Sequence, residues 1–299
     1  MQVVSAQHRL LRILRPWRQI DAHQFEVGLH TLKRPLVAAH RIGSAVAAGF
    51  AAALAGRAQL NLSLTASRAM IPPALAPEPL RQRLAAVPDM GPGRRRLVLL
   101  LPQLGDFDSI EYAQALAGAL PRLEAAGIGL LAIGIGDQAG ADRFCAYTAF
   151  PRPCLQADAE PVLHRALGLY EGLPAPGGPW ASLLLMCAGL GSPGTLQEVF
   201  RGYTGDRSAP PRLATPLFDL AGKGFQRPFE LATVRLANMR EVLGAWRTYV
   251  PDARWIAQRG GTFLLDADET LLYEHRDPGI LGFSATMADP LRFLEPWLA

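Results

Sequence analysis

Three cysteines, Cys145, Cys154 and Cys187, carry the most reactive side chains of this 299-residue sequence. An odd number cannot form a closed disulfide framework, which indicates a reducing compartment. Cys145 and Cys154 lie nine positions apart, so a reversible disulfide between them is conceivable and these two are the redox candidates. Cys145, between Phe144 and Ala146, is more typical of a small buried hydrophobe. Cys187 belongs to the apolar run LLLMCAGLG and is expected in the core.

The stretch from Gly105 to Ser109 could also do chemistry, because Asp106 and Asp108 are two residues apart. Acids and Ser at the start of a helix cap free N–H groups, and Ser109 is the expected N-cap. Two alternatives stay open, a paired-carboxylate acid/base site and a weak Mg²⁺ site. The six His residues are dispersed and none pairs with a Cys at zinc spacing, so we expect no metal centre and no cofactor.

A glycine motif, G-x-G-x-x-G at residues 189–194, follows an apolar run and precedes a helix. Dinucleotide binding also needs a βαβ context and an acid about 20 residues further on. Asp206 comes too early, and Asp219 lies in a Pro-rich loop without a clear strand before it. Thr195 and Glu198 instead fit a capping box for the next helix. The motif therefore predicts a helix start and no nucleotide site.

Strands and helices must position these side chains, and their order indicates an α/β fold. The apolar run at 97–101 predicts a strand buried on both faces. A helix at 109–127 and a second buried strand at 128–136 complete a βαβ unit. Helices are expected at 138–148 and after Asp158. Two β-type runs at 261–277 predict a hairpin, and a last helix is expected near 284–296.

Two further segments surround this core. Residues 173–253 read as a mainly helical insertion within a body at 78–299, and residues 1–77 form a basic N-terminal extension. Residues 1–70 hold nine basic residues and two acids, a net charge of +7, whereas the remainder has a net charge of −3. The basic pI therefore gives no support to nucleic-acid binding by the body.

The extension allows several interpretations. Arg9, Arg12, Arg15 and Arg18 alternate with apolar residues, which fits a basic helix on an anionic membrane or a solvated basic tail. An acid-poor, Arg-bearing leader is also typical of organelle-targeting segments. The uncharged run at 42–56 is too short to span a bilayer, which needs about 20 apolar residues.

Four stretches of the body resemble the AhpC/TSA peroxiredoxin superfamily, and most closely its peroxiredoxin-like 2 branch of cyanobacterial and plastid members. They are RRLVLLLPQLGDFDSIEYAQAL, GIGLLAIGIG, RFCAYTAFPRPCLQADAEPVLHRALGLY and GGTFLLDADETLLYEHRD. The resemblance implies a thioredoxin-like, three-layer α/β fold with a central mixed sheet and a helical insertion before the C-terminal ββα. It also implies a location in the cytoplasm or the plastid stroma, with peripheral membrane association open.

The same resemblance implies a Cys-x-x-Cys pair at the first strand–helix turn, where this sequence has Asp106 and Ser109. A carboxylate cannot be oxidised to a sulfenic acid, so peroxide reduction at this turn is excluded. Thioredoxins place a cis-proline before the strand that starts here at Gly260-Gly261-Thr262, and none is present. Arg259 corresponds to an Arg that peroxiredoxins often keep, and is either an anion-site remnant or a surface Arg.

The expected function is that of a binding or scaffold protein with a degenerate peroxiredoxin-like site. Its protein partner would dock on the 173–253 insertion, and residues 1–70 would contact a membrane surface. The alternative is a thiol-dependent antioxidant enzyme that uses Cys145 or Cys154. No nucleic-acid partner is expected.

Overall fold

The strands of the βαβ unit lie at the centre of a five-stranded mixed sheet. The computed structural model describes residues 74–204 and 223–298, and the sheet has the order β3-β2-β1-β4-β5. The strands are β1 (Arg96–Gln103), β2 (Gly129–Ile135), β3 (Leu155–Asp158), β4 (Gly261–Leu265) and β5 (Leu271–Arg276). β1 is parallel to β2 and antiparallel to β4, β2 is parallel to β3, and β4 and β5 form the expected hairpin.

Alternating side chains of β1 enter two separate cores, one on each face of the sheet. Leu97, Leu99 and Leu101 pack in the larger core with Ile110, Leu116 and Phe144 of the helices that cover one face. Val98 and Leu100 pack in the second core with Leu80, Leu84 and Leu163. All eight residues of β1 are buried, as expected for a strand covered on both sides. The fold is therefore a three-layer α/β structure of thioredoxin-like type, as the sequence predicted.

The helices of the outer layers agree with the sequence in part. They are α3 (Glu78–Ala85), α4 (Phe107–Ala117), α5 (Leu120–Ala125), α6 (Gln138–Thr148) and α7 (Val162–Ala166). The single helix expected at 109–127 is wrong, because the chain breaks near Gly118 into α4 and α5. The expected C-terminal helix is also wrong: Arg292–Trp297 is a 3₁₀-helix, and Pro296 within it disfavours a regular α-helix.

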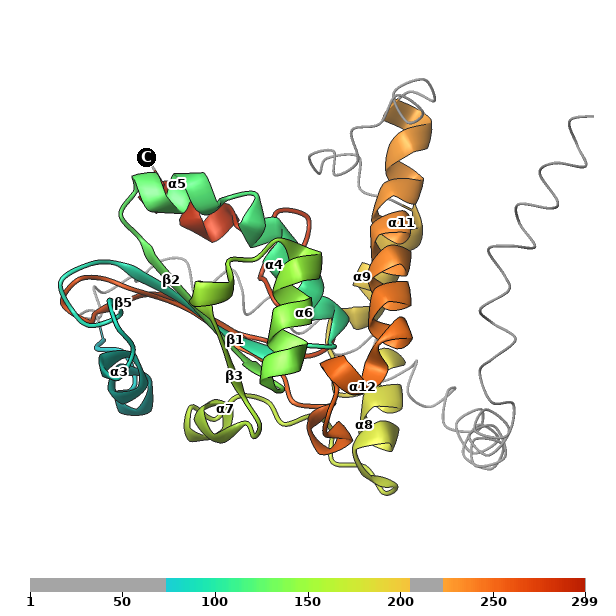
Figure 1. Cartoon of the computed structure of the whole chain (residues 1–299). Helices are drawn as coiled ribbons and strands as arrows, with labels where there is room; N and C mark the ends of the chain where they lie inside the picture. Colours follow the sequence, from blue (N-terminus) through green and yellow to red (C-terminus); the bar gives the residue numbers. More distant parts are fainter. Residues whose placement is uncertain (1–73, 205–222, 299) are drawn as a thin grey trace, which may run out of the picture. The chain divides into compact units, whose positions relative to one another are not determined.

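In its described residues, the segment between α7 and β4 supplies four α-helices. They are α8 (Gly178–Cys187), α9 (Thr195–Thr204), α11 (Lys223–Gly244) and α12 (Trp246–Tyr249). α9 packs against α11, and α11 packs against α4, beside the sheet (Figure 1). At the α11–α4 contact, Asn238 and Gln114 exchange two hydrogen bonds of 3.0 and 3.1 Å. The buried Glu111 of α4 accepts a hydrogen bond of 2.9 Å from Arg235 of α11.

The predictions that concern residues 1–73, among them the basic helix at 9–18 and the uncharged run at 42–56, lie outside the described residues. Within the described ranges, no helix combines the length and the hydropathy that crossing a bilayer requires. The boundary expected at residue 77 stays a prediction.

Candidate functional site

Asp106 begins α4 at the carboxyl end of β1. Its carboxylate accepts a hydrogen bond of 2.9 Å from the N–H of Asp108, so Asp106 is the N-cap of the helix. The expectation that Ser109 caps this helix is wrong. Ser109 lies within the first turn, fully buried, and its hydroxyl donates to the carbonyl oxygen of Gln103 over 2.9 Å. That bond fastens the helix to the end of the strand.

The turn before α4 is held against the end of the helical segment. A Cβ atom placed on Gly105 would lie 2.6 Å from Cγ2 of Val250 and 2.9 Å from Cβ of Tyr249. Because the Cβ of Tyr249 is bonded to the backbone, any side chain at position 105 would force the backbone of Tyr249 to shift. The close approach fixes the turn of Asp106 to the chain that follows α12.

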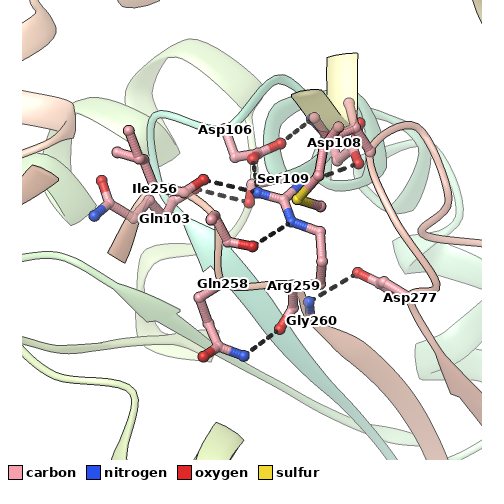
Figure 2. A network of polar contacts seen from close by, with 12 residues as sticks. Gln103, Asp106, Asp108, Ser109, Ile256, Gln258, Arg259, Gly260 and Asp277 are labelled. Carbon is pink, nitrogen blue, oxygen red and sulfur yellow. Dashed lines mark hydrogen bonds and ion pairs between the residues drawn. The ribbon is translucent and has the colours of Figure 1, made fainter. Parts of the chain in front are cut away.

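Arg259, two residues before β4, points its guanidinium at this turn (Figure 2). One nitrogen, Nη2, donates to the Asp106 carboxylate over 2.6 Å and to the carbonyl of Ile256 over 3.0 Å. Nε donates to the carbonyl of Ala257 over 3.2 Å, and Nη1 lies 3.7 Å from the carboxylate of Asp108. Arg259 is fully buried, so its interpretation as a surface Arg is wrong. A buried guanidinium of this kind needs a negative partner, and Asp106 supplies it.

Two more buried carboxylates surround the same guanidinium. Asp108 accepts a hydrogen bond of 2.7 Å from the N–H of Leu281, and burial raises its pKa well above the ordinary range. Asp277 accepts a hydrogen bond of 3.1 Å from the N–H of Gly260 (Figure 2). Burial raises the pKa of Asp277 to about 8, against the opposing charge of Arg259. One positive charge thus faces three carboxyl groups, and burial favours the protonated form of two of them.

A small recess lies between these carboxyl groups and the sheet. It is lined by Asp108, Ser109, Tyr112, Thr262, Asp277 and apolar side chains, and its space is too narrow for a water molecule. The hydroxyl groups of Tyr112 and Thr262 are hydrogen-bonded over 3.0 Å, and burial raises the pKa of the phenol. Among the described residues, one oxygen of Asp108 and one of Asp277 have no hydrogen-bond partner. Each of these oxygens can carry the proton that the raised pKa implies.

None of the three cysteines lines the recess. Cys145, in α6, is buried, and burial raises the pKa of its thiol to about 11. Burial also raises the pKa of Cys154. Cys187 is exposed at the end of α8, so its expected core position is wrong: most of the apolar run around it is exposed, although Met186 is buried. The pKa of the Cys187 thiol is raised by the atoms packed around it and by the charge of Asp106, and Arg259 opposes this. The sequence predicted no thiol near the turn, but the charges of Asp106 and Arg259 at the turn act on the thiol of Cys187.

The glycine motif at 189–194 connects α8 to α9, so it follows a helix and not a strand. This arrangement lacks the βαβ context that dinucleotide binding needs. The expected capping box is not formed, because the N–H of Glu198 donates to the carbonyl of Gly194 over 3.0 Å and not to Thr195. The hydroxyl of Thr195 instead donates to the carbonyl of Ile280 over 2.8 Å. The contact ties the start of α9 to the loop after β5.

Across the described ranges, no group of three or more His, Cys, Asp or Glu side chains is arranged to hold a metal ion. The weak Mg²⁺ site considered for Asp106 and Asp108 therefore has no third ligand among these residues. Asp106 is instead neutralised by Arg259, and Asp108 accepts from a backbone N–H. The turn is a buried ion-pair network.

Comparison with known proteins gives one result for this architecture. A family model described as AhpC/TSA antioxidant enzyme matches residues 115–279. No curated protein matches the chain, and no solved structure matches it. The matched range includes Arg259, Asp277 and all three cysteines, and it begins after the turn that holds Asp106 and Ser109.

Proposed function

Because the chain belongs to the AhpC/TSA family, we propose that it is a thioredoxin-fold member without a reactive thiol at the turn, acting as a binding or scaffold protein. The helical segment 173–253 provides its contact surface. The branch we favour is peroxiredoxin-like 2, of the cyanobacterial or plastid type. That assignment brings a cytoplasmic or stromal location, with peripheral membrane contact through residues 1–70.

The observation that carries the proposal is the ion pair of Asp106 with Arg259, 2.6 Å long. In peroxide reduction a thiolate at a helix N-terminus attacks the peroxide and becomes a sulfenic acid. Asp106 occupies a helix N-terminus beside a buried guanidinium, which is an environment that stabilises an anion. The anion here is a carboxylate, which has no sulfur to oxidise. The neighbouring Ser109 cannot act as the second thiol of a disulfide.

The alternative is a thiol-dependent antioxidant enzyme that uses Cys145 or Cys154. Both thiols are poor nucleophiles at neutral pH, because burial raises the pKa of each. Since the thiolate is the reactive form, a raised pKa leaves only a small reactive fraction. Neither thiol is at a helix N-terminus: Cys145 lies near the end of α6 and Cys154 ends a 3₁₀-helix. These features favour the binding protein.

Peroxide consumption by the purified protein tests the proposal. With thioredoxin or glutathione as reductant, we expect no turnover above a buffer blank for the wild type and for Cys145→Ser, Cys154→Ser and Cys187→Ser. Turnover by the wild type that disappears in Cys145→Ser or Cys154→Ser would establish the enzyme alternative. Turnover that disappears only in Cys187→Ser would place the reactive thiol on α8.

A further inference from the structure

The exposed side of α8 and α9 carries no charge of its own. Within residues 172–204 the only charged side chains are Glu198 and Arg201, which form an ion pair of 2.7 Å and are mostly buried. Every exposed position between residues 174 and 204 holds an uncharged residue. A water-facing surface of two helices normally carries charged and polar groups. This surface therefore has the composition of an interior.

Large apolar side chains fill that surface. Ten of the twelve exposed large apolar residues in the described part of the chain lie on α8, α9, α11 and the α8–α9 connection. They are Trp180, Leu184, Leu185, Leu190, Leu196, Phe200, Tyr203, Leu236, Met239 and Leu243, together called the apolar face. Their spacing of three, four or seven residues makes a stripe on α9 and another on α11. α9 contacts both α8 and α11, so the helices that carry the stripes are neighbours.

The area of the apolar face is large for a monomer. An aromatic side chain presents about 150–250 Å² of surface, and these ten residues are about half exposed, so the face measures on the order of 1,000 Å². The largest apolar patch on a typical monomer is about 300–600 Å². Stable interfaces bury about 800 Å² on each partner. The apolar face alone is thus large enough for a stable dimer.

The composition of the face indicates whether it binds protein or lipid. A helix that lies on a membrane carries Lys or Arg on its polar side. α8 contains no basic residue and is apolar all round, although much of it is exposed. A helix that is apolar all round is normally buried in protein. Charged residues are also depleted at the centre of protein interfaces, and aromatic residues and Met are enriched there.

We infer that the apolar face is the contact between two copies of this chain in a two-fold symmetric dimer. On α8 and α9 every exposed residue is uncharged, and on α11 the exposed Arg240 follows Met239, so the face offers little electrostatic selection for a foreign partner. A second copy presents the same apolar area, and two-fold dimers are the commonest oligomers. The inference rests on the proposed binding role of the helical segment, and it identifies the binding partner as a second copy of the chain.

Sedimentation velocity of the full chain tests this inference. At about 10 μM we expect a species of twice the 32.3 kDa chain mass, because a dimer with a Kd of about 1 μM or below is then mostly assembled. Phe200→Glu and Leu236→Glu each place a charge at two positions of the dimer and should weaken it about 100-fold or more. Val162→Glu, on α7, is the matched control: Val162 is 68% exposed, against 67% for Phe200, and this variant should remain dimeric. Urea unfolding of each variant checks that it is folded.

Two results would overturn the inference. One is a wild type that stays monomeric at about 100 μM, well above the Kd of a functional dimer. The other is a folded Phe200→Glu variant that dimerises as tightly as the control. If the monomer instead floats with phosphatidylcholine–phosphatidylglycerol vesicles and Phe200→Glu does not, the face binds lipid. None of these results depends on peroxide turnover, so a failed dimer and a failed proposed function are distinguishable.

Discussion

Replacing Asp106 by Asn removes the charge that Arg259 binds and keeps an oxygen that can cap α4. Arg259 is fully buried, so the variant leaves a cation in the interior without its nearest counter-charge. Breaking a buried ion pair by removing one partner costs about 3–5 kcal/mol of unfolding free energy. Arg259 keeps its bonds to the carbonyls of Ile256 and Ala257, and Asp108 remains at 3.7 Å. We therefore expect a loss near the lower limit, about 3 kcal/mol.

Asp106→Ala should lose a further ~1 kcal/mol, because Ala cannot cap the helix. A matched control is Asp137, the N-cap of α6, whose carboxylate accepts from the N–H of Gly140 over 2.7 Å. No arginine forms an ion pair with Asp137 among the described contacts. Asp137→Asn should change the unfolding free energy by less than about 1 kcal/mol, and Asp137→Ala should lose ~1 kcal/mol.

Urea unfolding at neutral pH, followed by circular dichroism, measures all four variants against the wild type. The reasoning requires Asp106→Asn to be clearly less stable than Asp137→Asn. Equal losses for these two variants would refute it, because the contact with Arg259 would then add nothing to the cap. A double-mutant cycle with Arg259→Met isolates the pair itself.

Three further predictions concern the same turn and the extension. Burial raises the pKa of Asp277 from 3.8 to about 8, so between these pH values the native state binds more protons than the unfolded state. The unfolding free energy of the wild type should therefore fall as the pH rises from about 4 to 8. In urea titrations Asp277→Asn should reduce this fall, and the same fall in both proteins would contradict the prediction. The double variant Asp106→Cys, Ser109→Cys should form a disulfide under mild oxidant, which counting of free thiols measures. If the folded variant forms none, this turn does not correspond to the Cys-x-x-Cys position. Full-length protein should float with anionic vesicles at low salt, because each basic residue near the surface contributes about 1 kcal/mol; changing the four arginines of residues 9–18 to Gln should reduce flotation, and equal flotation would remove that role for the extension.

The sheet could be predicted from the sequence because its central strands are continuous apolar runs. LVLLL at 97–101 and IGLLAIGIG at 128–136 have the length and flanks of strands that are buried on both faces. β3 was missed, because Leu155–Asp158 is short and only its first residue is buried. The break between α4 and α5 was missed as well, since the apolar spacing continues through it and only Gly118 marks it.

The site could be predicted only in part, because its charges meet across the fold. Asp106 and Ser109 follow from the position of the turn, but Asp106 and Arg259 are 153 residues apart. No local pattern couples residues at that distance; the antiparallel pairing of β1 with β4 brings them together. Cys187 was misplaced because an apolar run around a cysteine normally indicates burial. Cys187 is exposed because it belongs to the uncharged, solvent-facing surface of α8 and α9.

The fate of the three native cysteines after peroxide treatment tests the central claim most directly. Mass spectrometry of thiol-labelled protein would compare Cys145, Cys154 and Cys187 with and without hydrogen peroxide. We expect Cys145 and Cys154 to remain reduced, because burial raises the pKa of both, and we expect Cys187 to oxidise no faster than free cysteine. Rapid formation of a sulfenic acid at any of the three, or of a Cys145–Cys154 disulfide at stoichiometric peroxide, would contradict the loss of peroxide chemistry.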